Sequence, residues 1–220
     1  MGNPVITYLL AGLLIGYLFG STPFSWILVR LLKGIDMRHY GSRTVSGTMV
    51  GVLVSKPAAV LVGILDILKA LIPVWLGFRL QPHPFLASAI GIGALIGHCW
   101  PFWLGFHGGR GVSTILGSLA VLFPYGALYI LFALALGKLL NAGAITVLIS
   151  LLTMPFLARG LHAPTGVIYF SAAIFVITVI KRLEANREPL PEKGRFATIL
   201  RRLFFDRDIK DYHAWLSRHP

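Results

Sequence analysis

A glycine-rich turn that carries one arginine lies near the middle of the sequence, at Gly108-Gly109-Arg110-Gly111, and Thr114 follows it. If a helix begins directly after this turn, its free backbone amides and the positive end of its dipole lie beside a guanidinium group. That combination is typical of phosphate binding. The Gly-x4-Gly-Lys spacing of a Walker motif is absent, so the turn does not indicate a nucleotide. A tight turn between two helices, with an arginine on the inner face, is the structural alternative.

A second polar segment follows the first apolar run and contains Arg38, Gly41 and Ser42. Its small residues permit close approach of a ligand to the backbone, and its hydroxyls and free amides suit an anion. A solvated loop is the alternative, and this segment taken alone does not decide between the two.

His98 stands shortly before the glycine-rich turn, and together with Ser42 it is a candidate catalytic residue. An imidazole there would act as a general base or, in the more structural interpretation that we favour, would shape the pocket. Asp66 and Lys69 are three residues apart within an apolar run, so they share one helix face and can neutralise each other. Ionisable groups inside a membrane are functional candidates, although a structural ion pair explains these two equally well.

These polar groups are set in a strongly apolar chain of 220 residues, of which 56% are hydrophobic and 13% charged. This balance excludes an ordinary soluble domain and predicts an all-α integral membrane protein. The net charge of +12 does not indicate nucleic acid, because Lys and Arg lie in short loops and in the C-terminal tail. Turn residues and charges divide the apolar sequence into expected spans near residues 5–32, 57–78, 85–104, 111–122, 125–140, 143–158 and 163–181.

The distribution of positive charge predicts the topology. The basic tail from Lys181 and the basic loop between the first two spans should both be cytoplasmic, which requires an odd number of crossings. We therefore expect a compact bundle of about seven transmembrane helices with short half-helices, an outside N-terminus and a cytoplasmic C-terminus. Residues 1–188 would form the membrane-embedded domain, and residues 189–220 a basic amphipathic cytoplasmic tail.

The order and spacing of the polar segments resemble the PlsY family, the bacterial acyl-phosphate:glycerol-3-phosphate acyltransferases. The resemblance covers residues 12–188, and its second half is specific. It rests on Gly20-Ser21-x-Pro23-Phe24, Asp36-x-Arg38-x-x-Gly41-Ser42, Asp66-x-x-Lys69, Gly97-His98-x-x-Pro101, Gly108-Gly109-Arg110-Gly111-Val112-x-Thr114 and Arg182-Leu183.

The resemblance implies a multi-pass enzyme of the bacterial plasma membrane, with its active face toward the cytoplasm. Such an enzyme transfers a fatty acyl group from acyl-phosphate to glycerol 3-phosphate and forms lysophosphatidic acid, with membrane lipid around it and without a cofactor. An acyl-phosphate is already activated, so binding two phosphates and aligning a hydroxyl can suffice for catalysis. The expected phosphate-binding residues are Arg38, Ser42, Gly108, Gly109, Arg110, Gly111 and Thr114. The sequence does not set the oligomeric state.

The chain departs from the family pattern at several polar positions, namely Thr44, Met49, Val52, Asn141, Ala144, Val176 and Val179. Three functions therefore stay open: the same acyl transfer, transfer to a different acceptor, or a paralogue that has lost catalysis. A small membrane transporter is the alternative from another class, and the absence of inverted repeats argues against it.

Overall fold

The computed structural model describes residues 4–80 and 84–218, and within these ranges every regular element is a helix. The expected all-α class is thereby confirmed. The outer limits of the two expected domains, at residues 1 and 220, lie outside the described residues. The elements are α1 (Pro4–Gly20), α2 (Phe24–Lys33), η1 (Met37–His39), α3 (Gly47–Leu53), α4 (Lys56–Leu80), α5 (Pro84–Cys99), η2 (Phe102–Leu104), α6 (Val112–Leu122), α7 (Pro124–Leu139), α8 (Gly143–Gly160), α9 (Thr165–Glu184), η3 (Ala185–Arg187), α10 (Arg195–Phe205) and α11 (Tyr212–Leu216).

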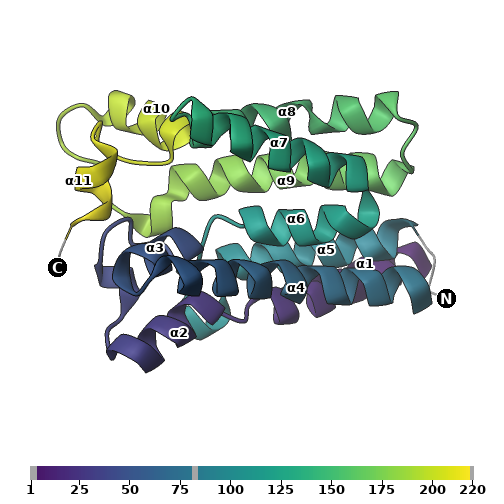
Figure 1. The fold of residues 1–220 in the computed structure, drawn as a ribbon. Helices are drawn as coiled ribbons and strands as arrows, with labels where there is room; N and C mark the ends of the chain where they lie inside the picture. Colours follow the sequence, from purple (N-terminus) through teal and green to yellow (C-terminus); the bar gives the residue numbers. More distant parts are fainter. Residues whose placement is uncertain (1–3, 81–83, 219–220) are drawn as a thin grey trace.

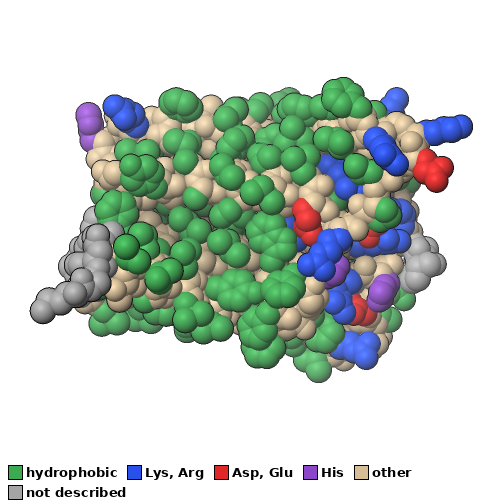
Figure 2. Space-filling model, turned by 180° about the vertical axis from the view of Figure 1, so that it is seen from behind, with side chains coloured by type: hydrophobic (Ala, Val, Ile, Leu, Met, Phe, Trp, Pro, Cys, Tyr) green, Lys and Arg blue, Asp and Glu red, His purple; other side chains and the backbone are tan. Residues whose placement is uncertain are grey.

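Five apolar segments within the described residues are long enough to cross a membrane: Ile6–Lys33, Lys56–Leu80, Phe85–Leu104, Gly143–Gly160 and Thr165–Arg187. Helices α6 and α7 are apolar but shorter. The surface agrees with this division, because hydrophobic side chains cover most of the face in Figure 2 and nearly all charged side chains gather at one end. The chain is a multi-pass membrane protein.

The helices form two layers (Figure 1). Helices α7, α8 and α9 lie in one layer, and α1, α4, α5 and α6 in the other. The largest group of buried apolar side chains fills the space between them and includes Leu95 of α5, Leu119 of α6, Leu151 of α8 and Phe170 of α9. Hydrophobic packing thus fixes α5, which bears His98, against α9, and holds α6 against α4, α5 and α7.

Glycines bring α1 and α5 into close contact. A Cβ atom at Gly16 would collide with the carbonyl oxygen of Ile90, and one at Gly93 with that of Leu13. Small residues at four-residue spacing let transmembrane helices approach backbone to backbone, where van der Waals packing replaces the missing hydrophobic force. The pair forms the most extensive helix–helix interface of the bundle.

The first expected span, residues 5–32, is broken in the structure. Helix α1 ends at Gly20 and α2 begins at Phe24, because Pro23 lacks an N–H group and adopts a non-helical conformation. By contrast, the short helix expected after the glycine-rich turn is confirmed. Helix α6 begins at Val112, and Gly111 before it has a φ of +81°, which favours glycine.

The polar connections collect at one end of the bundle. Helices α2, α3, α10 and α11 lie there, at the opposite end from the chain's N-terminus (Figure 1). The expected tail is amphipathic over α10, where Phe196, Leu200 and Phe204 form an exposed apolar stripe at four-residue spacing. A break at residues 206–211 separates α10 from α11.

Candidate functional site

A cavity of about 400 Å³ opens at the polar end of the bundle. It is lined by residues from helices α3 to α9, from the loop before α3 and from the C-terminal segment. Five of the residues singled out in the sequence line it: Ser42, Asp66, His98, Arg110 and Gly111. Helices distant in the sequence therefore bring the glycine-rich turn, the polar loop at Ser42 and the side chains of Asp66 and His98 to one place.

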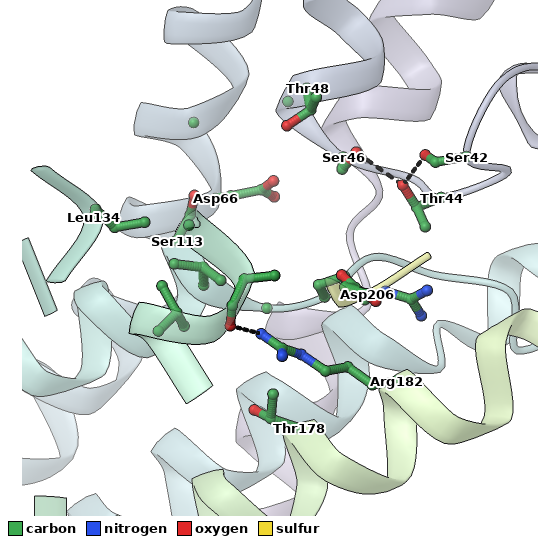
Figure 3. A pocket seen from close by; sticks show the side chains of 18 of the residues that line it. Ser42, Thr44, Ser46, Thr48, Asp66, Ser113, Leu134, Thr178, Arg182 and Asp206 are labelled. Carbon is green, nitrogen blue, oxygen red and sulfur yellow. Dashed lines mark hydrogen bonds and ion pairs between the residues drawn. The ribbon is translucent and has the colours of Figure 1, made fainter. Parts of the chain in front are cut away.

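Hydroxyl groups form one wall of this cavity. Ser42 Oγ lies 2.7 Å from Thr44 Oγ1, which lies 3.0 Å from Ser46 Oγ. Ser46 caps helix α3 by accepting a hydrogen bond from the backbone N–H of Met49. Figure 3 shows these three hydroxyls together at one side of the site. Since each hydroxyl can donate and accept, the row suits a polar or anionic ligand.

The glycine-rich turn is held in place by hydrogen bonds to its backbone and by close packing against His98. The backbone N–H of Gly109 donates to the carbonyl of His98 (3.1 Å), and Asn186 Nδ2 donates to the carbonyl of Gly108 (3.2 Å). A Cβ atom at Gly109 would collide with the His98 ring, and one at Gly108 with the His98 carbonyl oxygen. Gly108 and Gly109 thus serve close packing and do not line the cavity. Thr114 is fully buried and also lies outside the lining.

Arg110 extends from this turn into the cavity. Its Nη1 donates to the carbonyl oxygen of Lys181 (3.0 Å), and its Nε lies 2.7 Å from Oδ1 of Asp206. Only 14% of the Arg110 side chain is exposed. A guanidinium in such a sheltered position attracts an anion more strongly than one on an open surface, because water screens it less.

Asp66, Lys69 and His98 form a buried polar cluster beneath the cavity. Lys69 Nζ lies 2.8 Å from Asp66 and also donates to the carbonyl oxygen of Thr22 (2.9 Å). His98 Nδ1 lies 3.7 Å from Oδ1 of Asp66. Because His98 Nε2 packs against Gly109, the ring is wedged between the carboxylate and the turn.

Arg38 does not reach this cavity. Its guanidinium pairs with Asp36 (2.6 Å) and donates to the carbonyl of Leu104 (2.9 Å). It lines a second, more polar cavity of about 480 Å³, together with His39, Arg43, His107, Asn186, Arg187 and Glu188. Burial acts to raise the pKa of Asp36, but hydrogen bonds and charge from Arg38 outweigh it and lower that pKa to about 2.

Several lining residues were not singled out by the sequence as site residues. Arg182 is 4% exposed and donates to the carbonyl oxygens of Ala144 and Leu203, both at 2.9 Å. Thr178 lies one turn before it on the same face of α9, and Figure 3 places both across the cavity from the hydroxyl row. Their spacing of four residues was the available signal, but Arg182 had the simpler interpretation of a charged anchor at a span's end.

The departures from the family pattern fall in different places. Val52 and Val176 are about half exposed and Asn141 is exposed, and none of the three lines the cavity. Thr44 and Ala144 do line it. Thr178 supplies a hydroxyl on the cavity face of α9, beside the positions where Val176 and Val179 replace polar residues.

Comparison with known proteins agrees with this arrangement. The family model described as glycerol-3-phosphate acyltransferase matches residues 10–190. Glycerol-3-phosphate acyltransferase 5 of Dehalococcoides mccartyi is 32% identical over 212 residues, which cover 93% of this chain and 91% of that protein. The Shouchella clausii glycerol-3-phosphate acyltransferase is 33% identical over 187 residues, which cover 80% of this chain and 89% of that protein.

A solved structure shares the fold. The crystal structure of PlsY, an integral membrane glycerol 3-phosphate acyltransferase in its glycerol 3-phosphate form, matches with a TM-score of 0.73 and 26% identity. The match covers 80% of this chain and 88% of that one. Family model, full-length relatives and fold agree, so this chain belongs to the PlsY family of glycerol-3-phosphate acyltransferases.

Proposed function

We propose that this protein transfers a fatty acyl group from acyl-phosphate to glycerol 3-phosphate and so forms lysophosphatidic acid in phospholipid synthesis. Family membership makes it an acyltransferase of the membrane. The observation that carries the proposal is the gathering of Arg110, Ser42 and Arg182 around one cavity at the polar end of an otherwise apolar bundle. Such a place is accessible both to a water-soluble phosphate and to a lipid-borne acyl chain.

Arg110 and the amides that open helix α6 at Gly111 would hold one substrate phosphate. Ser42, with Thr44 and Ser46 beside it, would orient the other polar group from the opposite wall. Arg38 would act at a distance from the cavity, through its bonds to Asp36 and Leu104 that shape the adjoining loop. Gly108, Gly109 and Thr114 would keep the turn in the conformation that presents Arg110.

The reaction needs no nucleophilic side chain. The glycerol hydroxyl oxygen forms a bond to the acyl carbon, the bond from that carbon to the phosphate oxygen breaks, and phosphate leaves with the electron pair. The hydroxyl proton ends on the departing phosphate, so atoms and charge balance without a protein acid or base. Ser42 would align the reacting groups and His98 would shape the pocket, while the guanidiniums stabilise charge on the leaving group.

The topology that fits this function has seven crossings, with α6 and α7 as short spans, the N-terminus outside and the polar end in the cytoplasm of a bacterial plasma membrane. The gathering of positive charge at that end supports the orientation (Figure 2). Residues 1–188 would form the catalytic membrane unit and residues 189–220 a basic segment on its cytoplasmic end.

The test is acyl transfer by purified protein in lipid nanodiscs, with palmitoyl-phosphate and radiolabelled glycerol 3-phosphate as substrates and lysophosphatidic acid as the product. Wild-type protein should form the product, and Arg110→Ala should lose at least about a hundredfold in kcat/KM, as expected for a charged phosphate contact. An active family member serves as control. Folded protein that makes no product here, but acylates another polyol phosphate, would instead identify a different acceptor.

A further inference from the structure

The C-terminal segment beyond the family match, residues 195–218, is docked on the polar end of the bundle. Arg202 is 3% exposed; its Nε lies 2.7 Å from Asp208, and its Nη2 donates to the carbonyl of Glu188 (3.0 Å). Gly41 and Arg218 exchange two hydrogen bonds, at 2.8 and 3.0 Å. These contacts tie the segment to the loop before α3, which borders the cavity, and to the residues that follow α9.

The docked segment supplies part of the cavity wall. Phe205, Asp206, Tyr212, Trp215 and Leu216 line it, and Trp215 is 4% exposed. The family model ends at residue 190, so these side chains add to the site that the matched region builds. Among them Asp206 is the one that carries a charge.

Asp206 faces Arg110. The two side chains are 23% and 14% exposed, and Oδ1 lies 2.7 Å from Nε. Neither atom has a partner with hydrogen-bond geometry, so the contact is a charge contact at a poor angle. Such a contact is easier to replace than the two-pronged pairing that a guanidinium makes with a well-aligned carboxylate or phosphate.

The local backbone does not favour an aspartate at this position. Asp206 ends helix α10 with a φ of +53°, a conformation for which glycine and asparagine are the preferred residues. A carboxylate at this end of a helix is also repelled by the helix dipole. The compensating positive charges are those that line the cavity, Arg110 in contact and Arg182 nearby.

We propose that Asp206 is an affinity-determining residue of the active site, which competes with a substrate phosphate for Arg110. The docked C-terminal segment thereby sets how tightly the site binds a phosphate monoester. The inference rests on the proposed function in one respect, the assignment of Arg110 to phosphate binding. A phosphate that enters the cavity replaces the Asp206 carboxylate at the guanidinium, and the stronger the contact to Asp206, the weaker the binding.

The direct test is isothermal titration of inorganic phosphate and of glycerol 3-phosphate into the full-length protein in zwitterionic nanodiscs. Asp206→Asn removes the charge but retains the shape and tolerates the left-handed backbone, and Asp206→Gly serves as a second variant with the same tolerance. Both should bind the two ligands roughly three- to tenfold more tightly, the range of one partly exposed ion pair. Unchanged or weaker binding in both variants would overturn the proposal.

Asp211→Asn is the matched control. Asp211 is fully exposed on the same segment, does not line the cavity, and caps α11 through an oxygen that asparagine also provides. It removes the same charge from the segment, so its phosphate affinity should equal that of wild type. A gain in phosphate affinity in Asp211→Asn as large as that in Asp206→Asn would show a general effect of charge and overturn the proposal.

Adding Arg110→Ala to Asp206→Asn should abolish the gain in phosphate affinity. A gain that survives in the double variant would show that Asp206 does not compete at Arg110 and would overturn the proposal.

Kinetic measurements separate this inference from the proposed function. If wild type transfers acyl groups, Asp206→Asn should lower KM for glycerol 3-phosphate without lowering kcat, and an unchanged or higher KM contradicts the inference alone. If wild type transfers no acyl group but Asp206→Asn binds phosphate more tightly than wild type, the proposed function fails, and the competition of Asp206 with phosphate for Arg110 stands.

Discussion

The ammonium group of Lys69 lies 2.8 Å from the carboxylate of Asp66, one helical turn away on α4, and both side chains are at most 7% exposed. Both residues of the pair also have roles outside it. Lys69 also holds the carbonyl of Thr22 at the break between α1 and α2, and Asp66 lines the cavity next to His98. One buried ion pair thus joins the broken first span to the floor of the site.

Replacing Lys69 by methionine should destabilise the protein by about 3–5 kcal/mol, because Asp66 is left buried without its partner. Thermal unfolding in detergent, followed by circular dichroism, measures the change. The double variant Asp66→Asn with Lys69→Met removes both charges and should recover part of the lost stability. A double variant less stable than Lys69→Met would show that the two charges are not coupled.

Asn186 should act as a positioning residue. Its Nδ2 donates to the carbonyls of Arg43 (3.0 Å) and Gly108 (3.2 Å), and so ties the hydroxyl loop to the arginine turn. Loss of these two hydrogen bonds in Asn186→Ala should lower kcat/KM by roughly thirtyfold, mainly through KM, at about 1 kcal/mol per bond. Acyl-transfer kinetics measure this effect.

Asn141→Ala is the matched control for Asn186→Ala. Asn141 also has a positive φ, +53°, but it is exposed and does not line the cavity. Alanine tolerates this left-handed conformation less well than asparagine at both positions, so Asn141→Ala imposes the same backbone strain and should leave kcat/KM within about twofold of wild type. Equal losses in the two variants would attribute the effect to backbone strain and remove the positioning role.

Gly93→Ala should destabilise the bundle by about 1–3 kcal/mol, since the added methyl group meets the Leu13 carbonyl oxygen and forces α1 and α5 apart. Gly160→Ala is the control, because a Cβ there meets nothing within 4 Å. Melting temperatures in detergent measure both. If Gly93→Ala has the same melting temperature as Gly160→Ala, the close approach of α1 and α5 does not limit stability.

Asp36 should make the loop before α3 sensitive to acid. Its folded pKa of about 2 lies below the ordinary 3.8, so the bonds to Arg38 add stability above about pH 4 that is lost as the pH falls toward 2. Trp26 donates from its indole to Asp36 (3.1 Å) and reports the change. Subtracting the fluorescence of Trp26→Phe from that of wild type isolates the signal of Trp26, and this signal should change between about pH 4 and pH 2. The same subtraction made in the Asp36→Asn background should give a signal that does not change with pH.

The apolar runs, and the glycines and prolines that interrupt them, determined much of the fold. Apolar runs gave six of the seven expected helices near their observed bounds, and the turn at Gly111 and the proline at position 124 correctly delimited α6. The first run was expected as one span near residues 5–32, and Ile6–Lys33 is long and apolar enough to be one, but it consists of two helices. The sequence left this break open, although Pro23 was visible, because a proline in an apolar run can either kink a helix or end it. The glycines at 12, 16, 20, 93 and 97 were a readable signal for the α1–α5 contact.

The sequence also determined the chemistry on offer, since Arg110 in its glycine-rich turn and Ser42 in its polar loop were evident from residue type and spacing. Only the tertiary structure decided which groups meet. Arg38 is engaged by its neighbour Asp36, whereas Arg110 is met by Asp206 from the far end of the chain. In a membrane protein the lipid-facing and inward-facing sides of a helix are both apolar, so hydropathy does not tell which face of α9 bears the site; packing turns Thr178 and Arg182 inward and leaves Val176 exposed.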